Sequence, residues 1–127
     1  MFEIAVEHEF CAAHALSIGG AREALHGHNF KITVGIRGKT TDGDGLLCDF
    51  HTVREILEEL TEPLDNANLH DTDAFRGVNP SAENLAKHLG DELAQRLDGS
   101  LAPHASVSWV RVTEAPGCAA TYWRTPG

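Results

Sequence analysis

The chain has 127 residues, of which 42% are hydrophobic and 23% are charged, as expected for one globular domain over residues 1–127. Ten lysine and arginine residues stand against 19 aspartate and glutamate residues, so the formal net charge is −9. Proteins that bind the phosphate backbone of nucleic acids by general electrostatics need the opposite balance. We therefore expect no nucleic-acid partner.

The cysteines and the N-terminus indicate the compartment. Cys11, Cys48 and Cys118 are odd in number and form no C-x-x-C pair, so neither a disulfide framework nor a thiolate zinc site is expected. We expect Cys11 to be a buried structural thiol and the other two to be small apolar fillers. The first residues lack a basic segment, and no apolar stretch approaches the ~20 residues of a membrane helix. These features predict a cytoplasmic protein with no membrane partner.

Two strands are predicted in the first third of the chain. Residues 2–14 alternate strictly between two faces, with Phe2, Ile4, Val6 and Phe10 on the apolar one. A loop follows through residues 15–25, and residues 30–36 alternate again. The two strands are expected to pair antiparallel.

Two helices are predicted in the middle of the chain. Helical spacing from Val53 to Leu64, with a capping box formed by Thr52 and Glu55, predicts a helix that ends near Pro63. The pair Pro80-Ser81 opens a second helix, in which leucine recurs at every fourth position until Gly99 is expected to end it.

Two more strands, over residues 107–114 and 119–124, are predicted at the end of the chain. Both are rich in β-branched and aromatic residues, and the turn Ala115-Pro116-Gly117 separates them. The order is therefore strand pair, two helices, strand pair, which predicts an α+β domain.

Three histidines form the strongest candidate site. His26 and His28 share the parity of Phe30 in the second strand, and His14 has the same relation to the first strand. If the strands pair antiparallel, the end of the first meets the start of the second and the three imidazoles converge. Three neutral imidazoles suit Zn²⁺ and leave a fourth position for water or substrate, as in catalytic zinc sites. An H-x-H pair alone could also be two hydrogen-bonded histidines.

The remaining histidines have no partner at ligand spacing. His8 shares the face of His14 but lies roughly 20 Å away along an extended strand, so a position at the core edge or an interface is expected. We interpret His51, His88 and His104 as surface or capping residues.

The residues around these histidines resemble a known family. Residues 10–16 read F-C-A-A-H-A-L and residues 25–30 read L-H-G-H-N-F. They are similar to the F-x-A-A-H-x-L and L-H-G-H-x-[YF] motifs of the 6-pyruvoyl-tetrahydropterin synthase and 6-carboxytetrahydropterin synthase family. Residues 45–50, 64–65, 80–86 and 113–114 resemble four further family segments, so the likeness covers nearly the whole chain in order.

This resemblance implies a fold, an assembly and an activity. The fold would be the tunnelling fold, in which strand pairs of several subunits close into a barrel, as trimers that stack into hexamers with sites at subunit boundaries. The activity would be that of a zinc-dependent lyase on the pterin substrate 7,8-dihydroneopterin triphosphate, in folate or queuosine biosynthesis. Glu114 would anchor the pterin ring through two hydrogen bonds.

The chain departs from the family pattern at two places. No cysteine precedes His26 in residues 21–24, and Asn66 stands where the family has an assisting histidine. Glu23 resembles a glutamate that one class of the family uses in this loop to release 6-hydroxymethyl-dihydropterin, and Asp65 would support it. Three functions stay open: a lyase with Glu23 as general base, a metal- and pterin-binding homologue without turnover, and a different small-molecule lyase or aldolase.

His70 is the last candidate. Residues 64–70 read L-D-N-A-N-L-H where the family reads L-D-H-x-x-L-N, as if histidine and asparagine had exchanged places. If Asn66 and His70 lie on one helical turn, their side chains are neighbours on the same face. His70 would then serve as a proton carrier or substrate ligand. The alternative is that it caps the loop.

Overall fold

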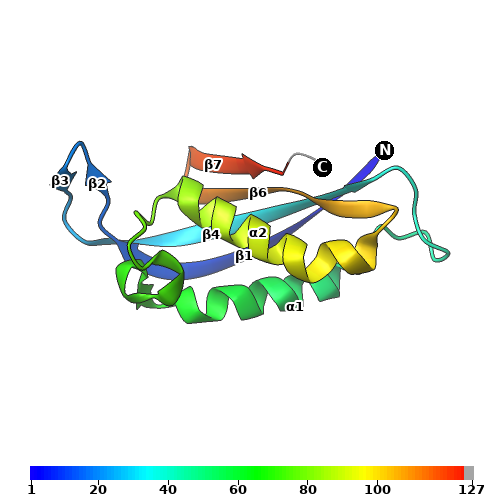
Figure 1. Ribbon diagram of the computed structural model, residues 1–127, viewed down its shortest axis with the longest axis horizontal. Helices are drawn as coiled ribbons and strands as arrows, with labels where there is room; N and C mark the ends of the chain where they lie inside the picture. Colours follow the sequence, from blue (N-terminus) through cyan, green and yellow to red (C-terminus); the bar gives the residue numbers. More distant parts are fainter. Residues whose placement is uncertain (125–127) are drawn as a thin grey trace.

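A five-stranded sheet with two helices on one face makes up the protein, shown in Figure 1 as a computed structural model that describes residues 1–124. The strand order is β5-β1-β4-β6-β7. The long elements are β1 (Phe2–His14), β4 (His26–Gly38), α1 (Phe50–Thr61), α2 (Ala82–Leu101), β6 (Ala105–Ala115) and β7 (Cys118–Trp123). The α+β class and both predicted strand pairs are confirmed.

The two longest strands, β1 and β4, pair antiparallel along their whole length, from Phe2 opposite Gly38 to His14 opposite His26. Their even-numbered apolar residues face the helices. The odd-numbered side chains lie on the other face, where Glu3, Glu7 and Glu9 are exposed. The alternation seen in the sequence therefore describes both strands correctly.

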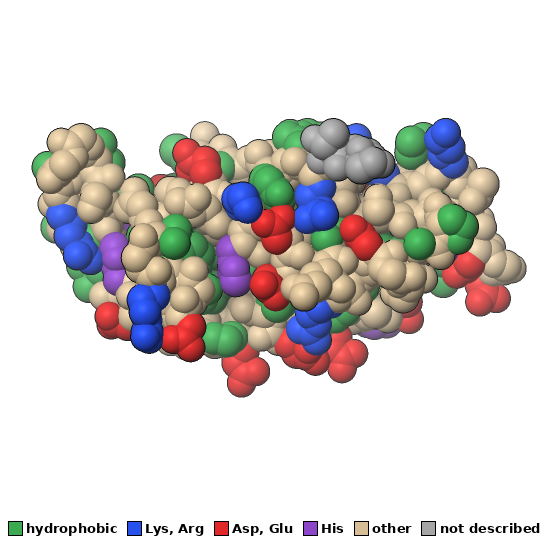
Figure 2. Space-filling view, in the orientation of Figure 1, with side chains coloured by type: hydrophobic (Ala, Val, Ile, Leu, Met, Phe, Trp, Pro, Cys, Tyr) green, Lys and Arg blue, Asp and Glu red, His purple; other side chains and the backbone are tan. Residues whose placement is uncertain are grey.

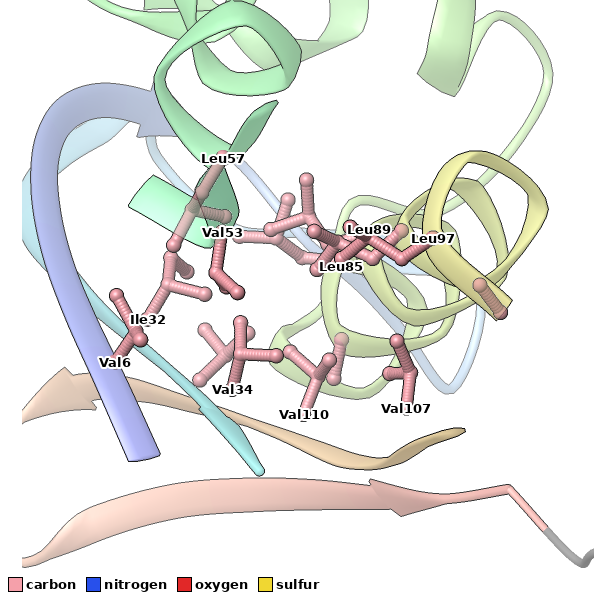
Figure 3. Packing of buried hydrophobic residues seen from close by; sticks show 14 of the residues in the cluster. Val6, Ile32, Val34, Val53, Leu57, Leu85, Leu89, Leu97, Val107 and Val110 are labelled. Carbon is pink, nitrogen blue, oxygen red and sulfur yellow. The ribbon is translucent and has the colours of Figure 1, made fainter. Parts of the chain in front are cut away.

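The hydrophobic core lies between the sheet and the helices. Figure 3 shows side chains from β1, β4 and β6 pointing toward those of α1 and α2. The fully buried residues of this core include Ile32, Val34, Val53, Leu57, Leu85, Leu89 and Val110. Each such side chain stabilises the fold by roughly 1.5–3 kcal/mol relative to an exposed one. This packing fixes the sheet that carries the histidines.

The helix ends differ from two predictions. Asp49 caps α1, because its carboxylate accepts a hydrogen bond from the His51 amide at 2.8 Å, so the predicted Thr52 and Glu55 capping box is wrong. The 3-10 helix η1 (Glu62–Leu64) follows directly. Ser81 caps α2, but Gly99 lies inside this helix, because Leu101 continues its buried stripe for one more turn.

Short segments appear where the sequence suggested loops. The strands β2 (Ser17–Ile18) and β3 (Ala21–Arg22) form a small hairpin that projects from one end of the molecule (Figure 1). β5 (Ala67–Asn68) pairs parallel with residues 12–13 of β1, and the 3-10 helices η2 (Leu69–Asp71) and η3 (Asp73–Phe75) follow it.

The helical turn considered for residues 66–70 is wrong. Asn66 has a left-handed backbone with φ of 57°, which interrupts any helical path, and the next two residues are extended beside β1. Asn66 tolerates this conformation better than most residues. Asn66 and His70 are therefore not neighbours on a helix face.

The cysteines are less buried than expected. Cys11 is exposed, because its odd position faces away from the helices, and its thiol donates a hydrogen bond to Asn29 Oδ1 at 2.8 Å. Cys118 is also exposed beside the turn at Gly117, so the predictions for both residues are wrong. Cys48 is half-buried, and burial raises the pKa of its thiol. Within residues 1–124, no helix is both long and apolar enough to cross a membrane.

Candidate metal centre

The β1–β4 ladder ends at a cluster of three histidines. His14 lies directly opposite His26, and His28 lies opposite Ala12, so all three side chains leave the sheet on the same face. Neighbouring rings meet edge to face, with centroid distances of 4.7 Å for His26–His28, 4.8 Å for His14–His26 and 5.1 Å for His14–His28. One ligand nitrogen from each ring lies within 4.8 Å of the other two. The structure thus brings together the three residues that strand parity grouped.

Hydrogen bonds set the tautomers of two rings. His14 Nδ1 lies 2.8 Å from the Pro80 carbonyl oxygen, and His26 Nδ1 lies 2.9 Å from that of Ala24. A carbonyl oxygen only accepts, so each Nδ1 donates its proton and each Nε2 has a free lone pair. Backbone contacts of this kind orient histidines that bind metals.

The third ring is also prepared for a metal. His28 Nε2 is buried and has no hydrogen-bond partner among the described residues, and the same is true of His14 Nε2. Burial is the main cause that lowers the pKa of His28, so this imidazole favours the neutral form that metals bind. Buried nitrogens without partners are rare in proteins.

Glu114 approaches the buried end of the cluster. It continues the inward parity of Val110 and Val112 on β6, and its Oε1 lies 3.2 Å from His14 Nε2. The contact is short, but no hydrogen bond joins the two atoms, and His14 Nε2 has no hydrogen-bond partner among the described residues. Three converging imidazoles, two of them with buried and unpartnered Nε2 atoms, fit a divalent metal ion.

Glu23 approaches the exposed end of the cluster. Its Oε1 lies 3.7 Å from His26 Nε2, and the side chain of His26 is 38% exposed whereas that of His14 is fully buried. Leu16 holds Glu23 at two points, with its amide 2.9 Å from Glu23 Oε1 and its carbonyl oxygen 2.9 Å from the Glu23 amide. The carboxylate therefore has a fixed position beside the open side of the site.

Asp65 and His70 lie elsewhere in the chain. Asp65 Oδ1 accepts a hydrogen bond from the Cys11 amide at 3.1 Å, at the edge of β1. Within residues 1–124, no hydrogen bond joins Asp65 to the histidine cluster or to Glu23. His70 Nε2 lies 2.7 Å from the carbonyl oxygen and 3.1 Å from the amide of Ala15, the residue after His14.

Other contacts at the site could not be recognised in the sequence. The Pro80 carbonyl that orients His14 is 66 residues away from it, and a carbonyl group has no side-chain signature. Asn79 binds both backbone groups of Ser17, at 3.0 Å and 3.1 Å. For Glu114 the sequence did contain a further indication: it has the same parity as Val112 on β6, which places both side chains on the same face of the sheet.

Acidic side chains are spread over the surface of the molecule. Figure 2 shows several of them along the rim where α1 lies. The exposed acidic residues of this rim are Glu55, Glu58, Glu59 and Glu62. Arg22 is exposed on the β2–β3 hairpin.

Comparisons with known proteins agree with this geometry. A family profile described as 6-pyruvoyl tetrahydropterin synthase matches residues 3–125. The 6-pyruvoyl tetrahydrobiopterin synthase of Poecilia reticulata is 37% identical over 78 residues, which are 60% of this chain and 53% of that protein. This chain therefore spans about half the length of the Poecilia relative.

Two further proteins complete the comparison. The dihydroneopterin monophosphate aldolase of Pyrococcus furiosus is 30% identical over 92 residues, which are 72% of this chain and 75% of that protein. The structure of Caenorhabditis elegans 6-pyruvoyl tetrahydropterin synthase superposes with a TM-score of 0.82 at 22% identity, covering 98% of this chain and 96% of that one. Profile and fold agree over almost every residue, and the chain belongs to the 6-pyruvoyl tetrahydropterin synthase family.

Proposed function

We propose that the protein is a zinc-dependent lyase that acts on 7,8-dihydroneopterin triphosphate or a closely related phosphorylated dihydropterin. The supporting observation is a pair of carboxylates at the two ends of the histidine cluster, Glu23 beside His26 and Glu114 beside His14. A lyase that acts on a pterin side chain needs a proton acceptor and a ring anchor next to the metal. The relatives named for pterin substrates support this substrate class.

Each residue has a distinct role in this proposal. His14, His26 and His28 hold the metal, since their Nε2 atoms are free of hydrogen bonds to the backbone. Bound zinc would act as a Lewis acid that lowers the pKa of a substrate hydroxyl. Glu114 accepts two hydrogen bonds from the guanidine-like edge of the pterin. Glu23 accepts the proton that leaves the side chain, from the position in which Leu16 holds it.

Asp65 and self-association belong to the same proposal. In its own chain, Asp65 binds the Cys11 amide and does not reach Glu23, so a supporting role in catalysis requires the site of a neighbouring subunit. The family resemblance implies a trimer or hexamer with sites at such boundaries. β7 is an edge strand, and an edge strand can pair with a second chain to continue the sheet toward a closed barrel.

The second candidate function is a homologue that binds metal and pterin without turnover. It is favoured by Asn66 and by the lack of a cysteine in residues 21–24, the two places where the family's usual proton-transfer groups are missing. Glu23 supplies a carboxylate near the metal and thus favours the lyase.

One experiment separates the two functions. Zinc-loaded protein is incubated with 7,8-dihydroneopterin triphosphate, and the products are identified by mass spectrometry. A 6-pyruvoyl, 6-carboxy or 6-hydroxymethyl pterin that forms with the wild-type protein and not with Glu23→Gln supports the lyase. Calorimetric binding of the pterin without product supports the binding homologue, and absence of both binding and product contradicts both functions.

A further inference from the structure

The residues at the end of β1 and directly after it are each held by a hydrogen bond. Four consecutive residues, His14, Ala15, Leu16 and Ser17, each contact a different residue: Pro80, His70, Glu23 and Asn79, respectively. The β1 end, the candidate base and the loop before α2 therefore form one connected unit.

The contact made by His70 sits on the peptide group that also holds Glu23. His70 Nε2 lies 2.7 Å from the Ala15 carbonyl oxygen, and the Leu16 amide of that same peptide lies 2.9 Å from Glu23 Oε1. A trans peptide is planar, and its C=O and N–H point in opposite directions. A ring that fixes the oxygen thus fixes the direction in which the N–H points.

His70 is itself held in a fixed position. Its amide donates a hydrogen bond to Asn68 Oδ1 at 3.1 Å, and its neighbour Leu69 is fully buried. The shorter of its two ring contacts is the one to the Ala15 carbonyl oxygen, to which a protonated Nε2 donates, whereas an unprotonated Nε2 accepts from the Ala15 amide. Either tautomer binds the backbone of Ala15. The ring nitrogen is therefore occupied by the backbone and is not free to exchange protons with a substrate.

We propose that His70 is a positioning residue that orients the Ala15–Leu16 peptide and, through it, the carboxylate of Glu23. This inference rests on the proposed function, because the orientation of Glu23 affects turnover only if Glu23 is the base. Displacement of a reacting group by about 1 Å can cost about 100-fold in rate. Donation to the carbonyl also polarises the peptide, which strengthens its N–H as a donor to Glu23.

The test compares two substitutions of one residue. In His70→Gln, the amide nitrogen can still donate to the Ala15 carbonyl, but the side chain carries no titratable proton. We expect kcat of His70→Gln within about 3-fold of wild type, and kcat of His70→Ala lowered about 10- to 100-fold with little change in KM, the range found for residues that orient functional groups. If the Gln variant is as impaired as the Ala variant, donation to the Ala15 carbonyl does not explain the loss and the positioning role is wrong.

His104 provides a matched control at the other end of the sheet. It is also half-buried, and its Nε2 lies 2.9 Å from the Leu47 carbonyl oxygen. We expect His104→Ala to lose thermal stability as His70→Ala does while its kcat stays at the wild-type value. The proposal is overturned if kcat falls equally in His70→Ala and His104→Ala. It is also overturned if kcat of His70→Ala does not fall.

A second measurement does not depend on turnover. Hydrogen exchange of the Leu16 amide is followed by NMR in zinc-loaded protein without substrate. The amide should exchange at least about 10-fold faster in His70→Ala than in wild type or His104→Ala, because freed peptides open locally. Unchanged exchange overturns the proposal even if the protein is an active lyase. Faster exchange in a protein without turnover supports the positioning role of His70 and contradicts only the proposed function.

Discussion

Both ends of the β1–β4 ladder lie near histidine side chains, but the two ends are built differently. At one end Phe2 faces Gly38, and the nearby His104 ring bonds to a backbone carbonyl. At the other end His14 faces His26, and two buried ring nitrogens have no partner among residues 1–124. Unpartnered buried nitrogens cost roughly 1–3 kcal/mol each. The same sheet thus satisfies the His104 ring nitrogen at one end and leaves binding capacity at the other.

The largest expected effect is the loss of the metal. His14→Ala removes one of the three proposed ligands, so we expect loss of stoichiometric zinc and of all metal-dependent turnover, a larger effect than the ~10- to 100-fold of changes in residues that only contact the ligands. Zinc content after dialysis, measured by mass spectrometry, checks this. His8→Ala is the control, because His8 is on the same face of β1. Zinc retained at wild-type affinity in His14→Ala would contradict the ligand assignment.

The second effect concerns the base. Glu23→Gln keeps an acceptor for the Leu16 amide but cannot take a proton, so kcat should fall about 10²- to 10⁴-fold. Zinc content should stay at the wild-type level, because the carboxylate lies 3.7 Å from His26 Nε2 and is not needed as a ligand. Single-turnover kinetics with the zinc-loaded variant measure the rate. A rate within threefold of wild type would remove Glu23 from the mechanism.

A smaller effect is expected at the pterin anchor. Glu114→Gln replaces a charged acceptor by a neutral amide, and hydrogen bonds to charged groups contribute about 1.5–3 kcal/mol, so pterin affinity should fall about 10- to 100-fold. Calorimetry with a dihydropterin measures the Kd, and zinc content is the control that should not change. Equal pterin affinity in the variant and in wild type would place the ring elsewhere.

The smallest effect lies at the packed end of the ladder. A Cβ added at Gly38 would lie 2.2 Å from the His104 carbonyl oxygen and 2.9 Å from Leu47 Cδ2. Backbone atoms yield little, so Gly38→Ala should lower the free energy of unfolding by about 1–3 kcal/mol. Urea denaturation measures this loss. Zinc affinity should be unchanged, and a parallel loss of zinc would show that the two ends are not independent.

Much of the fold follows from local patterns. Strict alternation predicted β1 with its observed bounds, and the parity of His14, His26 and His28 predicted that their rings converge. Both results depend only on the two-residue period of a strand, and every residue of the segment follows this period. The core could be located for the same reason.

The remaining features depend on contacts between distant backbone groups. The Pro80 carbonyl on His14, the pairing of β5 with β1, and the left-handed conformation of Asn66 have no local signal strong enough to identify them. The helical turn considered for His70 was wrong, although its ring does lie beside the residue that follows a metal ligand. Exposure of Cys11 was missed because alternation shows that there are two faces, not whether both are covered.

The pairing of His14 with His26 also limits where the chain can change in length. Deletion of one residue between Val6 and His14 would turn His14 to the opposite face of the sheet and separate it from both other ligands. The tip of the β2–β3 hairpin has no such constraint, since Gly19 and Gly20 are exposed, have positive φ values of 59° and 83°, and pair with no strand. Insertions and deletions in natural relatives should therefore concentrate at this tip, which makes it the natural place to attach a tag or a reporter.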